Sequence, residues 1–438
     1  MAVASQLYAE PPPAAKPPLQ NQVRSLLQEL DADQLARRHK AERELLDMGH
    51  VILPLLPPPE LLPNPSVRAT VARVRVTLER RKARESVQPA QITIASKNLK
   101  LRDWLQQIET QTTNHLDLED LPPGILDSEV DQDLPPTTFW QALQTVLPSK
   151  QVRFQFAPDS SDLKLVPEGT PGTDAAWKVA IDGPFRVAVD SVRPRKVAGN
   201  DQQQRLRTEL SVAPEPRLRA LFLKLAAKDF RATGPGNRVF PASDAAAQFD
   251  LPLGEGGRFV RWNLDFTAPS ALSSAEIFPL KIEGQATMQI AASSEHIRFT
   301  DLVNGAGTAR RRGGVTVAMQ KVQAKLQADG TQTISIKVLV AYDTGGPAFE
   351  SHRTWIFHNE VYLDQHVGDP LPANGGFETD LQTNGAVGVT YHFQGVKGPL
   401  ADYEFVYVAP TLIIDVPVKI QLDAIQPQAA QRTLDCAP

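Results

Sequence analysis

The spacing of apolar residues changes from period 2 to period 3.6 and back, twice, between residues 91 and 165. Residues 91–95 alternate like a half-buried strand, and the apolar residues that follow fall on one helical stripe, at Leu101, Trp104, Leu105 and Ile108. A second amphipathic helix over 139–147 precedes two strands, at 152–156 and 163–165. The pattern predicts a small α/β module over 87–170, of the order βαβ-αββ, in which Trp104 and Trp140 are core residues on two helices that pack on one sheet.

This module is similar to a known family. The stretches ITIASKNLKLRDWLQQIETQTTNHLDL, TTFWQALQTVL and VRFQF resemble the short N-terminal domain of secretins and TonB-dependent receptors. Members of that family are envelope modules that bind partners and carry no catalytic residues. The resemblance therefore implies a binding role outside the cytoplasm.

Residues 21–86 are expected to form a helical hairpin. Asp33 is a predicted N-cap, Gly49 stands where a left-handed residue ends a helix, and Asn64 with Pro65 opens a second helix. The spacing resembles a single HEAT-like repeat, and a lone helix pair is expected to dock on the next domain or on a partner. The basic end of the second helix, at Arg80, Arg81, Lys82 and Arg84, is interpreted as complementing the helix C-terminus, with a contact surface as the alternative.

The chain becomes β-rich from residue 177. Strand patterns occur at 185–189, 206–212, 260–266, 287–291, 315–319, 334–340, 387–393 and 412–420. Turn clusters separate them at the spacing typical of β-sandwiches.

This β-rich half also repeats itself. GPFRVAVDSV (183–192) parallels GGVTVAMQKV (313–322), RLRTELSVA (205–213) parallels TISIKVLVA (333–341), and 259–290 parallels 387–420. The predicted equivalent pairs are Val187 with Val317, Leu210 with Val338 and Met288 with Val418. We therefore expect two tandem antiparallel β-sandwich domains, 176–300 and 313–425, with an exposed, cleavable linker over 305–314 and a tail over 426–438.

Taken together, the pattern predicts a multidomain α+β chain. Its 438 residues carry a formal net charge of −4, which argues against nucleic acid as the partner. No apolar run is long enough to span a bilayer, and the lone Cys436 excludes an intramolecular disulfide and a Cys-rich zinc site.

The first 20 residues are expected to form a disordered, Pro-rich leader. Leu7, Tyr8 and Ala9 read like the end of a signal peptide that lacks its charged and apolar parts, with a mature start near Glu10. Together with the envelope-type module, this favours a periplasmic or secreted protein.

Candidate chemistry is sparse. Seven acidic residues gather in a predicted loop that could surround Ca²⁺, at Asp117, Glu119, Asp120, Asp127, Glu129, Asp131 and Asp133. They lack the spacing of a calcium loop, so a solvated loop is the preferred interpretation. His352 and His358 are too far apart on one strand to share a metal, and His366 and His392 could join them only through tertiary folding.

The aromatic residues raise the question of sugar binding. Trp177, Trp262, Trp355, Tyr391, Tyr403 and Tyr407 lie in strand patterns, where buried core is the preferred interpretation. The run Arg310, Arg311 and Arg312 is assigned to the flexible linker, with a proteolytic site or an anionic partner as alternatives.

Two functional hypotheses follow. The first is a non-enzymatic secreted or envelope protein, a scaffold for a protein partner or an envelope component, without cofactor, metal or catalytic residues. The second is a carbohydrate-binding protein or carbohydrate-active hydrolase with an unrecognised carboxylate pair.

Overall fold

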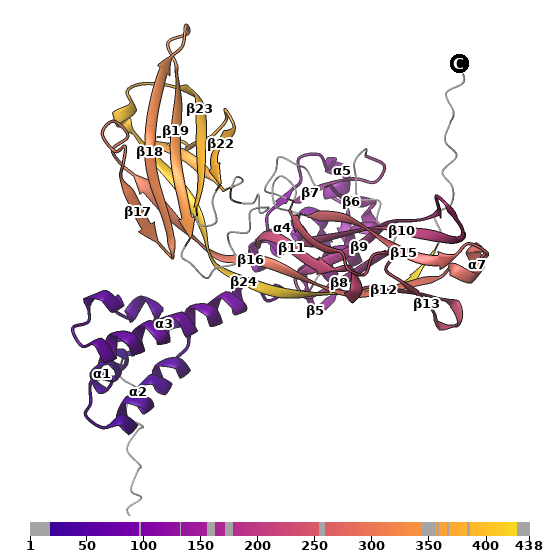
Figure 1. The fold of residues 1–438 in the computed structure, drawn as a ribbon, viewed down its shortest axis with the longest axis horizontal. Coiled ribbons are helices and arrows are strands. Elements are labelled where there is room, and N and C mark those ends of the chain that lie inside the picture. Colours follow the sequence, from indigo (N-terminus) through magenta and orange to yellow (C-terminus); the bar gives the residue numbers. More distant parts are fainter. Residues whose placement is uncertain are drawn as a thin grey trace, which may run out of the picture. The chain divides into compact units, whose positions relative to one another are not determined.

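A computed structural model describes residues 18–95, 98–131, 133–155, 163–170, 178–253, 259–342, 356, 359–365, 368–382 and 386–426. These residues form a mixed α+β protein that is mostly β (Figure 1). The chain divides into two compact units between Ser86 and Val87. Residues 1–17 of the predicted leader fall outside the described residues, as do the predictions for His352, His358 and His366, for Trp177 and Trp355, and for Cys436. Leu19 and Gln20 of the predicted disordered leader are helical, so the leader was predicted too long.

The described part of the N-terminal unit, residues 18–86, contains three α-helices, not the predicted pair: α1 (Leu19–Glu29), α2 (Leu35–Asp47) and α3 (Pro65–Ser86). Two 3₁₀ turns, η1 (His50–Leu55) and η2 (Pro59–Leu61), connect α2 to α3. Val23 of helix α1 and Leu30 directly after this helix belong to the same core as the other elements. This third helix covers apolar surface that a hairpin would leave open, so the expectation of a lone helix pair was wrong.

The helix ends follow the predicted capping with one error. The side-chain oxygen of Asn64 accepts a hydrogen bond from the backbone N–H of Ser66 at 2.8 Å, and Gly49 has a φ of 77°. Helix α2, however, begins at Leu35 with Gln34 as its N-cap residue. Asp33 lies one position too early to cap it.

The α/β module has both predicted helices, α4 (Leu101–Thr112) and α6 (Phe139–Val146), and the short elements α5 (Pro123–Leu126) and η3 (Leu147–Lys150). Trp104 and Trp140 are buried in its core. Its strands form three small sheets: β1 (Gln91–Ile94) with β5 (Leu134–Thr138), β2 (Leu99–Lys100) with β4 (Glu129–Val130), and β3 (Leu116–Asp117), β7 (Leu163–Pro167) and β6 (Val152–Gln155). The prediction of one sheet was wrong, because three of these strands are only two residues long and cannot extend a common sheet.

The β-rich half of the chain contains two similar sheets and a larger third sheet. The first sheet has the order β15-β10-β9-β8 and contains β8 (Lys178–Asp182), β9 (Phe185–Val197), β10 (Asn200–Pro214) and β15 (Val260–Pro269). The second sheet has the order β17-β18-β19-β23-β22 and contains β17 (Ala309–Arg312), β18 (Val315–Leu326), β19 (Gln332–Tyr342), β22 (Phe377–Gln382) and β23 (Ala386–Val396). Each of the eight strand patterns predicted from residue 177 onward lies within a strand of the structure.

A third sheet, of eight strands, contributes residues to the core under the first sheet and to the core under the second sheet. We call it the shared sheet. It contains β11 (Arg219–Ala226), β12 (Arg231–Gly234), β13 (Arg238–Pro241), β14 (Gln248–Pro252), β16 (Leu280–Phe299), β20 (Val361–Gln365), β21 (Leu371–Pro372) and β24 (Tyr403–Ile425). Short helical turns, namely η4 (Ala227–Asp229), η5 (Pro235–Asn237), α7 (Ser274–Ile277) and η7 (Leu400–Asp402), punctuate the loops.

Strands β16 and β24 are the centre of the shared sheet (Figure 1). They pair antiparallel from Leu280 opposite Ile425 to Phe299 opposite Phe405. The core under the first sheet includes Met288 of β16 and Val418 of β24, and the core under the second sheet includes Phe299 of β16 and Phe405 of β24. Each long strand therefore passes from one core into the other.

From β8 in the first sheet and from β17 in the second, four strands follow in the same order, and β22 has no counterpart in the first sheet. The two sheets also share a register shift. Asp190 of β9 and Gln320 of β18 are extra residues at register shifts that lie 130 positions apart in the chain. The predicted equivalents Val187 and Val317, and likewise Leu210 and Val338, are fully buried in the first and second cores respectively.

Two expectations about the repeat need correction. Met288 and Val418 are both buried, but both lie in the first core, because β24 crosses into it. The Arg-rich stretch is also not wholly a linker, since Arg310–Arg312 belong to β17 and pair with β18, although their side chains are exposed.

Candidate functional site

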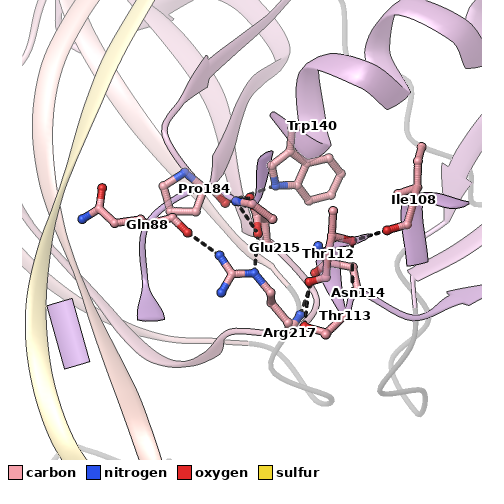
Figure 2. Close-up of polar contacts among 10 residues, drawn as sticks. Gln88, Ile108, Thr112, Thr113, Asn114, Trp140, Pro184, Glu215 and Arg217 are labelled. Carbon is pink, nitrogen blue, oxygen red and sulfur yellow. Dashed lines mark hydrogen bonds and ion pairs between the residues drawn. The ribbon is translucent and has the colours of Figure 1, made fainter. Parts of the chain in front are cut away.

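The densest group of buried polar contacts that we identified lies where the α/β module meets the first sheet (Figure 2). Five chain segments meet there: 88–90 before β1, Asn114 after α4, Trp140 on α6, Pro184 between β8 and β9, and 215–217 after β10. We call this group the docking junction. These segments are spread over more than 120 positions of the sequence, from 88 to 217, so only the tertiary fold brings them together.

Glu215 is the central residue of the docking junction. Its side chain is 0% exposed, and its carboxylate accepts hydrogen bonds from the backbone N–H of Ala90 at 3.0 Å and from Nε of Arg217 at 2.7 Å. Its own backbone N–H donates to the carbonyl of Pro184 at 2.9 Å. A buried carboxylate is costly unless it is paired, and here each oxygen has a donor.

Arg217 connects the carboxylate to the module. Its guanidinium donates to the carbonyl oxygen of Gln88, and its backbone N–H donates to the side-chain oxygen of Asn114 at 2.9 Å (Figure 2). The Arg217 side chain is only 17% exposed. Arg217, which follows β10 of the first sheet, thus contacts two separate parts of the module, one through its side chain and the other through its backbone N–H.

Apolar and aromatic contacts complete the docking. Nε1 of Trp140 donates to the carbonyl of Pro184 at 3.2 Å, and the guanidinium of Arg186 lies over the Phe154 ring, 5.3 Å from its centre. Ala213 of β10 belongs to the module's core, and Ile181 of β8 packs against it. The module therefore covers one end of the outer face of the first sheet.

The electrostatics of Glu215 reflect its burial. Burial raises the pKa of its carboxyl, while Arg217 and then the Ala90 N–H act in the opposite direction. The arrangement can hold two parts of the chain together, and it leaves the carboxylate fully covered from solvent.

The predicted acidic cluster is divided in the structure. Asp117 and Asp120 lie 3.9 and 2.8 Å from Nζ of Lys164, whereas Asp127 lies 3.4 Å from Nζ of Lys100. The remaining members are exposed, namely Glu119, Glu129, Asp131 and Asp133. Across the described ranges, no three His, Cys, Asp or Glu side chains are grouped so as to hold a metal ion.

His392 and the aromatic residues considered for sugar binding have surroundings typical of structural residues. Nδ1 of His392 lies 2.9 Å from Oγ of Ser335, and its Nε2 lies 3.5 Å from Glu378. Four of the aromatic residues considered for sugar binding are buried: Trp262, Tyr391, Tyr403 and Tyr407. Their rings are therefore packed inside the protein and not presented on a face where a sugar could stack.

A second buried polar group escaped sequence reasoning. Arg219 donates to the side-chain oxygen of Asn359 at 2.8 Å, and the Asn359 amide donates to the hydroxyl of Tyr407 at 2.7 Å. Burial lowers the pKa of Arg219 and raises that of Tyr407 to about 12. For the docking junction, the only local signal is the charged Glu-Pro-Arg sequence at 215–217 directly after a predicted strand.

None of the described helices is both long enough and apolar enough to cross a membrane. No protein-family model matches the chain, and no curated protein matches it significantly.

Proposed function

We propose that this chain is a non-enzymatic envelope or secreted protein that acts as a binding scaffold, in which the α/β module is held in a fixed position on the β region. The observation that carries the proposal is the docking junction. In this junction, Glu215 is fully buried and is paired with Arg217, and both residues form hydrogen bonds to the module.

Fixed docking is useful to a binding protein because a surface assembled in advance loses less conformational entropy when a partner binds. The resemblance of the module to partner-binding envelope domains supports the same role. Under this proposal the partner is a protein or another envelope component.

We also infer how the scaffold is organised. The common strand order and the register shifts 130 residues apart support two copies of one antiparallel β-sandwich, with β16 and β24 shared between them. The helical N-terminal unit is a HEAT-like element under this proposal.

The test combines location with capture. The native gene product is fractionated, and the intact chain is used as bait in envelope extracts beside Arg217→Ala and Arg153→Ala. Arg153 lies on the same module, and its ion pair with Glu168 is exposed, so it is the matched control. We expect a partner that wild type and Arg153→Ala retain and that Arg217→Ala captures less.

Two results would contradict the proposal. One is a set of captured proteins that is the same for all three baits although Arg217→Ala has lost the docking. The other is turnover of envelope glycans by the purified chain.

A further inference from the structure

Four arginines gather on the outer face of the first sheet, beyond the end that the module covers. Arg193 of β9 is directly opposite Arg207 of β10, and Arg195 is directly opposite Arg205. We call these four residues the arginine quartet. Like charges directly opposite each other on adjacent strands are destabilising, so this arrangement costs stability.

Among the described residues, Asp265 is the only carboxylate that forms an ion pair with the quartet. Asp265 of β15 receives two hydrogen bonds from Arg207, both at 2.9 Å, and lies 3.9 Å from Arg205. Arg193 and Arg195 are exposed and form no ion pair with any residue that the structure describes. The surface formed by the quartet is therefore positively charged, although the formal net charge of the chain is −4.

The positive charges of the quartet lower the pKa of Asp265. Its pKa is lowered chiefly by the hydrogen bonds from Arg207, and Arg205 and Arg195 lower it further. The carboxylate is thus held charged, and it neutralises one of the four guanidinium groups.

The second sheet offers an internal comparison. There the register places Gln323 opposite Ser335 and Lys325 opposite Thr333, at the positions that correspond to the two arginine pairs. These residues carry one positive charge in place of four. The same backbone arrangement therefore exists without the quartet, so the fold does not require it.

The geometry limits the size of a ligand. Cβ atoms of opposite residues lie about 5 Å apart, and residues two apart on a strand lie about 7 Å apart. This area matches a few linked anionic groups. Arginine forks bind phosphate through two parallel N–H donors, and a single carboxylate would neutralise only one of the remaining charges.

We propose that the arginine quartet binds a soluble ligand that carries two or more linked phosphate groups. The inference rests on the proposed function in naming a ligand class for that binding role, but it uses a different surface. If the quartet does not bind phosphate, the result of the capture experiment with Arg217→Ala is unaffected. If the capture experiment fails, phosphate binding by the quartet can still be measured.

The test uses sodium tripolyphosphate and the intact chain in isothermal titration calorimetry at low and physiological ionic strength. We expect saturable binding to wild type that weakens with salt. The double variant Arg193→Gln and Arg205→Thr copies the second sheet and should bind at least about tenfold more weakly. Arg193→Lys with Arg205→Lys should lie between the two, because lysine keeps the charge and loses the fork.

Lys325→Ala is the matched control on the second sheet, and it should bind like wild type. Thermal melts of all variants establish that they are folded. The proposal is overturned if wild type shows no saturable binding, if the Gln/Thr double variant binds as tightly as wild type, or if the chain binds phosphatidylglycerol vesicles but not tripolyphosphate.

Discussion

Four strands of the first sheet and four of the second follow the same order with the same register shift, yet the outer faces of the two sheets differ. On the first sheet, Arg186 is buried beneath the module, and the arginine quartet lies beyond it, with Arg207 half-buried and the other three arginines exposed. On the second, the position that corresponds to Arg186 is Thr316, which is only half-buried. Inward positions such as Val187 and Val317 are alike. The comparison indicates that packing constrains the inner face, whereas the outer face is free to specialise.

The largest expected effect concerns the module that only the first sheet carries. Trp104 is fully buried in the module's core. Trp104→Ala should lower the free energy of unfolding by about 3–5 kcal/mol, through lost apolar contact and the cavity that remains. Denaturant titration measures this change, and a loss below about 1 kcal/mol would show that the module's core is assigned wrongly.

The next effect compares a buried ion pair with an exposed one. Arg217→Ala strands the buried carboxylate of Glu215 and should cost about 2–3 kcal/mol, somewhat less than for a fully buried pair because Arg217 is 17% exposed. Lys337→Ala on the second sheet removes a half-exposed pair with Asp380 and should leave stability unchanged within error. If denaturant titration gave equal effects for the two variants, the claim that the buried pair contributes more to stability than the half-exposed pair would be contradicted.

The pH dependence of stability sharpens the comparison further. Because burial raises the pKa of Glu215, the folded state holds that proton more tightly than the unfolded state does. This contribution to stability is complete below the unfolded pKa of about 4.5 and is lost as pH rises through the folded pKa. Glu215→Gln should remove this fall from the stability profile, and Arg217→Ala should deepen it. Parallel profiles for wild type and Glu215→Gln between pH 4 and pH 8 would refute the assignment.

The smallest effect is expected on the outer face. Arg205→Thr replaces an arginine by the residue at the corresponding position of the second sheet and removes one repulsive pair with Arg195. Its melting temperature should stay equal to that of wild type or rise slightly. A marked drop would mean that the quartet stabilises the sheet, which would undermine its interpretation as a binding surface.

Local patterns predicted the strands well because burial alternates along them. In β15, for example, Val260, Trp262 and Leu264 are buried while Arg261 and Asn263 are exposed. The pairing of β16 with β24 could not be predicted, because it joins strands separated by more than 100 residues and depends on register. Helix α1 was missed as a separate element although Val23 and Leu30 repeat at helical spacing.

The sites were harder to predict for the same reason. Glu215 reaches Ala90 across 125 positions in the sequence, and no local pattern identifies such a contact. The quartet is visible in the sequence as two Arg-x-Arg motifs, at 193–195 and 205–207. Only the pairing of β9 with β10 brings the two motifs together.

The most direct test of the account asks whether the two sheets are held together by the β16 and β24 pair. Limited trypsin digestion at the exposed Arg310–Arg312 run should cut the chain into two pieces, which denaturing gels would resolve. Because β24 remains paired with β16 along its length, the pieces should elute as one particle in native size-exclusion chromatography. Elution of a separate C-terminal piece that melts cooperatively by itself would contradict the shared sheet and restore two independent domains.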